Sequence, residues 1–275
     1  MHRKLVAAIS VVGAAMLGTA MIAGPANAIV GGQPATQRYP FMASLSIDVG
    51  GVDHFTCGGS LITPDVVETN AHCVALKEQP VTAAELRIRV GSDSDTAGGT
   101  VVGVDAIIVN PKWDEDTAGG DIALLKLTRS VPYRPIPIAL RPPSPGDQVR
   151  SIGFGCTVEP DACTRNTLPA TLQQLDSRVV ASHLCTGGMI HASEFCNGPA
   201  QDGGQQCAGD SGSPVMVSFF GQWFLAGSVS RDGDASPTGP GSCHGQTGVD
   251  VSMTDYLMWI VAEVWQTERE RVATS

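Results

Sequence analysis

A serine set among glycines is the strongest local signal for chemistry in this sequence. Ser211 lies in the run Gly209-Asp210-Ser211-Gly212-Ser213-Pro214, where small residues let the backbone turn and present a hydroxyl together with N–H groups. A hydroxyl in such a turn is a candidate nucleophile when a base lies beside it. A Gly-Asp-Ser-Gly match arises by chance at a rate on the order of one percent in a chain of this length, so the motif needs support.

Three segments that precede Ser211 supply that support. Ile29-Val30-Gly31-Gly32 comes first, Thr69-Asn70-Ala71-His72-Cys73 places a histidine beside a cysteine, and Asp121 opens the apolar run Ile122-Ala123-Leu124-Leu125. A base, a carboxylate and a hydroxyl are the side chains that nucleophilic catalysis by serine uses. These landmarks follow one another in a single order.

Short strands must position these residues, because apolar or alternating runs are separated by Gly, Pro, Asp and Ser. Such runs predict an all-β sandwich or barrel. Examples are residues 41–47, 101–109, 122–127 and 219–229. Six prolines within residues 132–145 disfavour both helix and central strand, so we predict a connection between two halves there.

The clearest helix signal comes last. Ser252 and Asp255 resemble a capping box. Apolar residues recur at helical spacing at Leu257, Ile260, Val261, Val264 and Trp265. We predict a helix over about residues 253–267 whose apolar stripe packs on the core, followed by a polar end that frays.

The composition is that of an acidic globular protein. The 275 residues include 17 Lys and Arg against 27 Asp and Glu, a net charge of −10, and 43% are apolar. No basic run or basic face with interleaved aromatic residues is present to release counterions from a polyanion. The apolar fraction therefore excludes disordered and collagen-like proteins. The lack of a basic face means that no nucleic-acid partner is expected.

The first 28 residues have the pattern of a secretory signal. Arg3 and Lys4 precede an apolar run over residues 5–24, and Ala26-Asn27-Ala28 has small residues at the −3 and −1 positions of a cleavage site. A membrane anchor is the alternative, since roughly 20 apolar residues span a bilayer, but the Ala and Gly content favours cleavage. No later segment is apolar enough to span, so we expect a secreted, extracellular protein with no membrane partner.

Eight cysteines fit that compartment and predict four disulfides. They allow 105 pairings, and the residues alone select none. A zinc site would need Cys-x-x-Cys pairs or close Cys/His ligands, whereas the closest cysteines, Cys156 and Cys163, have six residues between them. We expect no metal.

Over essentially the whole chain after residue 28, the sequence resembles the trypsin/chymotrypsin family of serine endopeptidases. The matching segments are IVGG at Ile29, FTCGGSLI at Phe55, TNAHC at Thr69, DIALLKL at Asp121, EFCNG at Glu194, GDSGSP at Gly209 and YLMWI at Tyr256. The resemblance implies an all-β protease domain over residues 29–275, with two packed antiparallel six-stranded β-barrels over about 29–135 and 146–252 and a C-terminal helix. The active site would lie in the cleft between the barrels.

The resemblance implies His72 as general base, Asp121 as the carboxylate that orients it and Ser211 as nucleophile, in the chain order known for chymotrypsin. The base takes the proton of the attacking hydroxyl and returns one to the leaving amine. The N–H groups of Gly209 and Ser211 are the implied donors to the oxyanion. This chemistry needs no cofactor.

The resemblance also implies an ion pair between Asp210 and the α-amino group that forms when the chain is cut before Ile29. Signal cleavage after Ala28 would free Ile29 directly. Cleavage near Gly18-Thr19-Ala20 would instead leave residues 21–28 as a short propeptide, and the sequence leaves both routes open.

The implied disulfides are Cys57–Cys73 beside the base, Cys185–Cys196, and Cys207–Cys243 at the specificity pocket, which leaves Cys156–Cys163 for the fourth.

The match is weakest at the substrate pocket. Six residues before Ser211, trypsin-like members carry an Asp that receives Lys or Arg, whereas this chain has Gln205, followed by Gln206. An amide floor is polar but uncharged, so it would hydrogen-bond a substrate side chain or narrow the pocket. The other implied pocket residues are Ser230, Asp232 and Gly248. Asp232 or Asp250 would supply the missing acid, so a preference for basic side chains stays open.

Two further places depart from the family pattern. After Ser230 the family usually has Trp-Gly, whereas this chain has Arg231-Asp232-Gly233. Glu68 stands in the strand before TNAHC, where an apolar residue is usual. A glutamate inside a barrel costs several kcal/mol unless it is paired or protonated, and the alternatives are that it faces solvent or a basic partner.

We therefore expect a monomeric, secreted serine endopeptidase that acts on proteins or peptides through an acyl-enzyme and meets protein inhibitors. The alternative is a catalytically silent relative that binds protein through the same cleft. An α/β-hydrolase esterase is excluded because its Ser-Asp-His order and Gly-x-Ser-x-Gly elbow are absent. Asp114-Glu115-Asp116 would offer calcium ligands, although an isolated acidic turn is more often a solvated loop.

Overall fold

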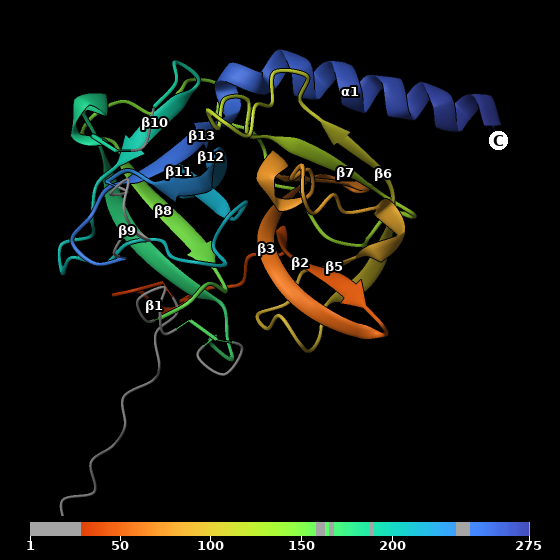
Figure 1. Ribbon diagram of the computed structural model, residues 1–275, viewed down its shortest axis with the longest axis horizontal. Helices are drawn as coiled ribbons and strands as arrows, with labels where there is room; N and C mark the ends of the chain where they lie inside the picture. Colours follow the sequence, from red (N-terminus) through yellow and green to blue (C-terminus); the bar gives the residue numbers. More distant parts are fainter. Residues whose placement is uncertain (1–28, 158–162, 165–167, 188–189, 235–242, 275) are drawn as a thin grey trace, which may run out of the picture.

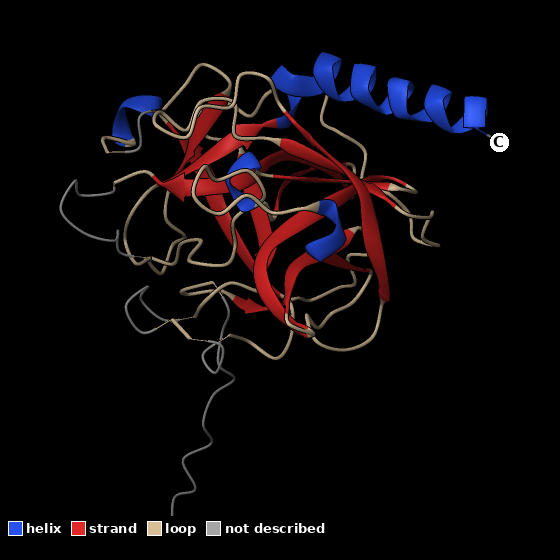
Figure 2. Cartoon of the chain, turned by 45° about the vertical axis from the view of Figure 1, so that its right-hand side comes forward, coloured by secondary structure: helices blue, strands red, loops and turns tan. Residues whose placement is uncertain are grey.

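Two β-barrels lie side by side in this protein, and one long helix starts near their junction and runs over the top of the first barrel (Figure 1). The computed structural model describes residues 29–157, 163–164, 168–187, 190–234 and 243–274. The expected secretory signal lies outside these residues. Strands dominate, and helix is confined to short turns and the C-terminal segment (Figure 2). Among the described residues, no helix is long and apolar enough to cross a membrane.

The first barrel closes through antiparallel pairing in the order β2-β3-β4-β7-β6-β5. Alternation builds it, as β5 shows: Leu86, Ile88 and Val90 are buried, and Arg87 and Arg89 between them are partly exposed. The strands are β2 (Met42–Val49), β3 (Val52–Thr63), β4 (Val66–Thr69), β5 (Leu86–Val90), β6 (Thr100–Val109) and β7 (Ala123–Leu127). Short 3-10 turns over Ala71–Cys73 and Ala83–Glu85 follow β4 and precede β5.

The second barrel runs in the order β9-β10-β13-β12-β11-β8 and closes because β8 also pairs with β9. Its strands are β8 (Gln148–Gly153), β9 (Gln173–Val180), β10 (Glu194–Asn197), β11 (Pro214–Phe219), β12 (Gln222–Asp232) and β13 (Gly248–Ser252). A two-residue strand, β1 (Gln33–Pro34), adds to the edge of β9, and a 3-10 turn over Ser182–Leu184 follows β9. The all-β prediction of two packed six-stranded barrels is confirmed.

The predicted single run over residues 219–229 is wrong, because it contains a hairpin turn. Phe219 ends β11 and pairs with Gln222 at the start of β12, so Phe220 and Gly221 form a two-residue loop. Both have positive φ, 50° and 76°, as a hairpin turn of this length requires. Asn or Asp usually occupies the first of these positions. The sequence Phe220-Gly221 therefore gave no recognisable turn signal.

The C-terminal helix α1 (Met253–Thr274) continues seven residues past the predicted end at 267, and its last turns project beyond the first barrel (Figure 1). No Pro or Gly interrupts it, and Glu and Arg are good helix formers. The predicted apolar stripe is only partly in the core. Ile260 is buried, whereas Trp265 is 69% exposed.

Glu68 in β4 is a carboxylic acid at the contact between the barrels. It is 0% exposed, so the alternative that it faces solvent is wrong. Ser60 of β3 and Ser228 of β12 are its polar neighbours and favour the ionised form, but burial outweighs them. Burial, with a contribution from the charge of Asp121, raises the pKa of Glu68 to about 8. The folded protein therefore holds Glu68 protonated at neutral pH.

We expect this group to make folding sensitive to pH. Between about pH 4.5 and 8 the unfolded chain ionises Glu68 and the folded chain does not, so the free energy of unfolding falls as pH rises, by on the order of a few kcal/mol. Replacing Glu68 by Gln should reduce that slope in denaturant titrations at several pH values. The matched control is Glu78→Gln, the same change at an exposed site. Equal slopes in the two variants would contradict the assignment.

Candidate active site

His72 is held by Asp121 through two contacts. Its Nδ1 atom lies 2.8 Å from Asp121 Oδ2, and its backbone N–H donates to Asp121 Oδ1 at 2.9 Å. His72 sits in the 3-10 turn after β4, and Asp121 lies just before β7, which pairs with β4. The antiparallel pairing of these two strands therefore places the carboxylate under the imidazole and leaves Nε2 as the ring nitrogen free to act.

Asp121 remains ionised although it is buried. Burial alone would raise its pKa, but the charge of His72 and hydrogen bonds from His72 and Ser230 hold the pKa below its ordinary value. Ser230 reaches across from β12 and donates its hydroxyl to Asp121 Oδ2 at 2.6 Å. Asn70 Nδ2 donates to the backbone carbonyl of Asp121 at 2.6 Å. Both barrels thus fix the carboxylate.

The glycine that follows Ser211 lets this turn pack closely against β3 and β4, the strands that lead to His72. Gly212 has a φ of +75°, and a Cβ there would lie 2.3 Å from Thr69 Oγ1 and 2.5 Å from the carbonyl oxygen of Gly58. Gly58 N–H also donates to the carbonyl of Ser211 at 2.7 Å. Only glycine permits this approach, which brings the turn after Gly209 to the strand that leads into His72.

The same turn offers two N–H groups. The amides of Asp210, Gly212 and Ser213 donate to carbonyls of Cys207, Val229 and Asp210 at 2.8–2.9 Å. Those of Gly209 and Ser211 form no such bond within the part of the chain that the structure describes. Two adjacent unengaged amides are what binding of an oxyanion requires.

Asp210 points away from solvent into the turn. Its Oδ1 accepts from Gly155 N–H at 2.9 Å and its Oδ2 from Cys207 N–H at 3.0 Å. Burial raises the pKa of Asp210 to about 7, against the effect of these two donors. Ile29 is also fully buried, and the carbonyl of Val30 accepts from Gln205 N–H at 2.9 Å. The segment that begins at Ile29 is therefore buried and pairs with Gln205, five residues before Asp210.

A cavity of about 250 Å³ opens beside Ser211. Four of the five predicted pocket residues line it: Gln206, Ser230, Asp232 and Gly248. Gln205 does not, because its side chain turns inward. Its Nε2 donates to the carbonyls of Asn197 and Gln246 at 3.2 and 3.1 Å, and its Oε1 accepts from Gln206 N–H. The amide on the cavity wall thus belongs to Gln206.

Asp250 lies out of the cavity, fully buried in β13. Burial raises its pKa to about 8, whereas the neighbouring amide side chains of Gln206 and Asn197 favour its ionised form. At neutral pH it is a protonated acid behind Gln206. Asp232 is the carboxyl side chain on the cavity wall itself.

The eight cysteines form four disulfides in the pairings that the resemblance implies: Cys57–Cys73, Cys156–Cys163, Cys185–Cys196 and Cys207–Cys243. The first adjoins His72, and Cys207 and Cys243 line the cavity beside Ser211. The sulfur atoms of Cys57 and Cys73 lie within 4.8 Å of a His72 nitrogen. They are bonded to each other, so they are not thiolates that could bind a metal.

The acidic turn at residues 114–116 is engaged by a lysine. Lys77 Nζ lies 2.9 Å from Asp116 Oδ2, and the backbone N–H of Lys77 donates to Glu115 at 2.8 Å. Asp114 accepts from the N–H of Asp116 and from Thr117. These carboxylates accept hydrogen bonds from the protein's own donors, which agrees with a surface loop and gives no support to a calcium site.

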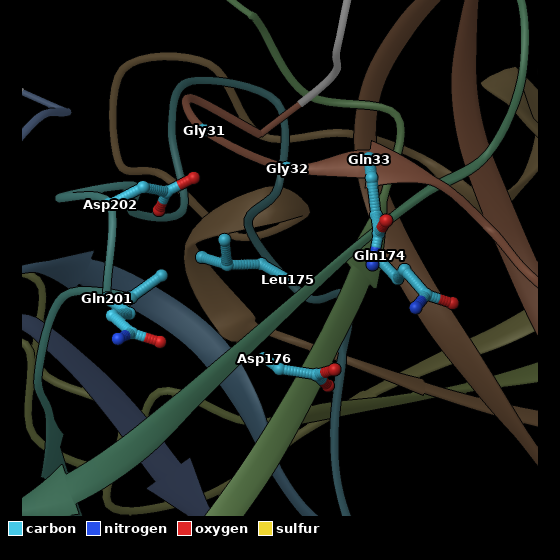
Figure 3. Close-up of a pocket in the computed structure, with 9 residues that line it drawn as sticks. Gly31, Gly32, Gln33, Gln174, Leu175, Asp176, Gln201 and Asp202 are labelled. Atoms are coloured by element: carbon cyan, nitrogen blue, oxygen red, sulfur yellow. The ribbon is translucent and has the colours of Figure 1, made fainter.

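A larger cavity, about 520 Å³, lies beside the N-terminal segment and is not lined by His72, Asp121 or Ser211. Figure 3 shows Gln201 and Asp202 on one loop near Gly31 and Gly32, with Leu175 and Asp176 on β9. Asp176 is bonded to Arg150 at 2.6 Å, and no serine, cysteine or histidine is among the described residues that line this cavity. Ser211 lies at the smaller cavity instead.

Sequence reasoning missed Glu194 and Arg231 as site residues. Arg231 lines the cavity beside Ser230 and bonds Glu194 of β10. The signal available was an arginine directly after the pocket serine, but nothing in the sequence connects it to an acid 37 residues earlier.

Comparisons with known proteins agree with this geometry. The family model described as Trypsin matches residues 29–260. Tryptase from Mus musculus is 31% identical over 262 residues, which cover 86% of this chain and 90% of that protein. Hypodermin-A from Hypoderma lineatum is 30% identical over 250 residues with the same coverage. Trypsin theta from Drosophila erecta is 34% identical over 200 residues, 69% of this chain and 72% of that protein.

Proposed function

Because this chain belongs to the trypsin family of serine endopeptidases, we propose that Ser211, His72 and Asp121 are its catalytic triad and that it cleaves peptide bonds through an acyl-enzyme. The observation that carries the proposal is that Asp121 accepts hydrogen bonds from both Nδ1 and the backbone N–H of His72. The bond to Nδ1 favours the tautomer in which Nε2 accepts a proton.

Each step has a residue assigned to it. His72 takes the proton of the Ser211 hydroxyl as Oγ attacks the carbonyl carbon, and Asp121 stabilises the imidazolium that forms. The N–H groups of Gly209 and Ser211 receive the oxyanion. His72 then protonates the leaving amine, the C–N bond breaks, and water attacks the acyl-enzyme by the same route with His72 again as base.

We further propose that the protein is exported, that its signal is removed, and that it acts outside the cell on protein or peptide substrates and meets protein inhibitors there, as a monomer. The four disulfides support export, because such bonds persist in oxidising compartments. The active form would begin at Ile29, which is buried and precedes the pairing of Val30 with Gln205.

The side chain that precedes the cut bond would enter the 250 Å³ cavity and meet the amide of Gln206. Replacing Gly248 by Ala should narrow this cavity, because a Cβ there lies 2.7 Å from Gln206 Oε1. We expect kcat/KM to fall roughly 10-fold or more for substrates with large side chains at that position, and less for those with alanine. Steady-state kinetics on a matched peptide pair measures this. An equal loss for both substrates would place Gly248 outside the pocket.

The proposal is tested with the disulfide-bonded protein beginning at Ile29, digested against a diverse peptide mixture with the cut sites read by mass spectrometry. A fluorophosphonate, which reacts with activated serines, should label Ser211 in the wild type and not in His72→Ala. The residues before the cuts report what Gln206 and Asp232 accept. If the folded protein is not labelled and cleaves no peptide, the proposal is overturned and the silent binding relative is favoured.

A further inference from the structure

We propose that Arg231, held by Glu194, is a positioning residue for the catalytic carboxylate and acts through the hydroxyl of Ser230. The inference rests on the proposed triad, because it assigns a role in orienting Asp121. It adds two residues of the second barrel, on β12 and β10, to the machinery.

The guanidinium of Arg231 is fixed in place by a two-point contact. Its Nη1 donates to Glu194 Oε1 at 2.9 Å and its Nη2 to Glu194 Oε2 at 2.7 Å. The side chains are only 19% and 2% exposed, and Glu194 Oε2 also accepts from His191 N–H at 2.7 Å. A bidentate, largely buried pair has defined geometry, so Arg231 is positioned independently of substrate.

That position sets the direction of the hydrogen bonds that end at the triad. Arg231 Nη1 donates to Ser230 Oγ at 3.0 Å, and Ser230 Oγ donates to Asp121 Oδ2 at 2.6 Å. A guanidinium can only donate and a hydroxyl has one proton, so the contact with Arg231 leaves the Ser230 proton for Asp121. A donor that itself accepts from a cation is polarised and donates more strongly.

The pair also places charge near the triad from the wall of the substrate cavity. The titratable groups around the pair and the triad are Asp121 before β7, His72 after β4, Glu68 in β4, His191 before β10, Asp232 in β12, Asp250 in β13 and Tyr256 in α1. Glu68 and Asp250 are protonated at neutral pH, as shown above. Arg231 is therefore a cation joined to the ionised Asp121 through the Ser230 hydroxyl, and Glu194 balances its charge.

The test compares Arg231→Met, Arg231→Lys and Glu194→Gln by their pH profiles of kcat/KM on one peptide substrate. Arg231→Met removes the cation and leaves the negative charge of Glu194 unbalanced, which favours the protonated form of His72. The acid limb of the kcat/KM profile should therefore move up by about half a pH unit, and kcat should fall about 10-fold. Glu194→Gln leaves the cation unbalanced and should move the limb down. Arg231→Lys should keep the limb within about 0.2 of a unit.

Opposite shifts distinguish positioning from structural support, because loss of packing alone would lower stability in both variants and move neither limb. The proton resonance of His72 Nδ1, followed by NMR in the same variants, supplies a readout that does not need turnover and should shift with Arg231→Met. Unmoved limbs and an unmoved resonance in folded variants would overturn the role of Arg231. An inactive wild type whose resonance still responds would count against the proposed function instead.

Discussion

Replacing Ser211 by Ala should lower kcat by about 10⁶-fold and leave KM and the free energy of unfolding close to those of the wild type. The methyl group fits where the CH₂ stood, and Ser211 makes its structural contact through its backbone carbonyl, which Gly58 N–H still reaches at 2.7 Å. What disappears is the oxygen that forms the acyl-enzyme. Activity left over would come from the Gly209 and Ser211 amides acting on direct attack by water.

Ser213→Ala is the matched control for this experiment. Ser213 lies two residues away in the same turn, and its buried hydroxyl has no hydrogen-bond partner in the described part of the chain. Its removal should leave kcat within about twofold and should not lower stability. Progress curves with active-site titration compare the two variants at equal concentrations of folded protein. Similar activity in both would show that Ser211 is not the nucleophile.

The residues of the proposed triad could be selected from the sequence because each sits in a local pattern. Gly209 and Gly212, which flank Asp210 and Ser211, specify a turn through their positive φ, and His72 and Asp121 lie next to the ends of buried strands that pair. The barrels were predictable for a similar reason, since alternation in a strand such as Leu86–Val90 fixes which side chains face the core.

Glu68 shows where alternation stops being informative. All four residues of β4 (Val66–Thr69) are buried, because one face looks into the first barrel and the other meets the second. Alternation with a period of two places polar residues in solvent only when one face of the strand is exposed to solvent. Neither face of β4 is exposed at the contact between the barrels, so the sequence alone could not say whether Glu68 was exposed, paired or protonated.

Side-chain direction was the second quantity that the sequence could not supply. Spacing from Ser211 places the backbone of Gln205 near the pocket, but carbonyls of Asn197 and Gln246 capture its amide and turn it inward. Arg231 finds Glu194 only because β12 and β10 both pair with β13. Such choices depend on which distant partners the barrel assembles, and no local pattern records them.

The chain that begins at Ile29 should be at least about 100-fold more active than the same chain with Ala28 retained. A free α-amino group is a cation below its ordinary pKa of about 7.7–8.0, and Ile29 is buried in a segment that pairs with Gln205, five residues before Asp210. Among the described residues, the side chain of Asp210 accepts only backbone N–H bonds, and burial raises its pKa to about 7. A cation delivered by Ile29 would ionise it and hold it.

Asp210 controls the oxyanion donors because it belongs to their turn. Its side chain bonds Cys207 N–H and its backbone carbonyl accepts from Ser213 N–H, so both ends of the segment with Gly209 and Ser211 depend on it. Loss of one oxyanion donor costs about 2.7–4 kcal/mol in the barrier, on the order of 10²–10³ in rate. Asp210→Asn should show a similar loss, and Asp202→Asn, an exposed aspartate near the same segment, should show none.

The pH dependence of activity identifies the amine as the group responsible. Pairing raises the pKa of an amine and lowers that of a carboxylate, so the contact should be intact at neutral pH and lost as pH rises through the raised pKa of the α-amino group. Kcat of the Ile29 form should therefore fall on an alkaline limb above about pH 8. Asp210→Asn should lack this limb, since it has no pair to lose. Acetylation of Ile29 should abolish most activity at every pH, and an acetylated enzyme with full activity would disprove the pair.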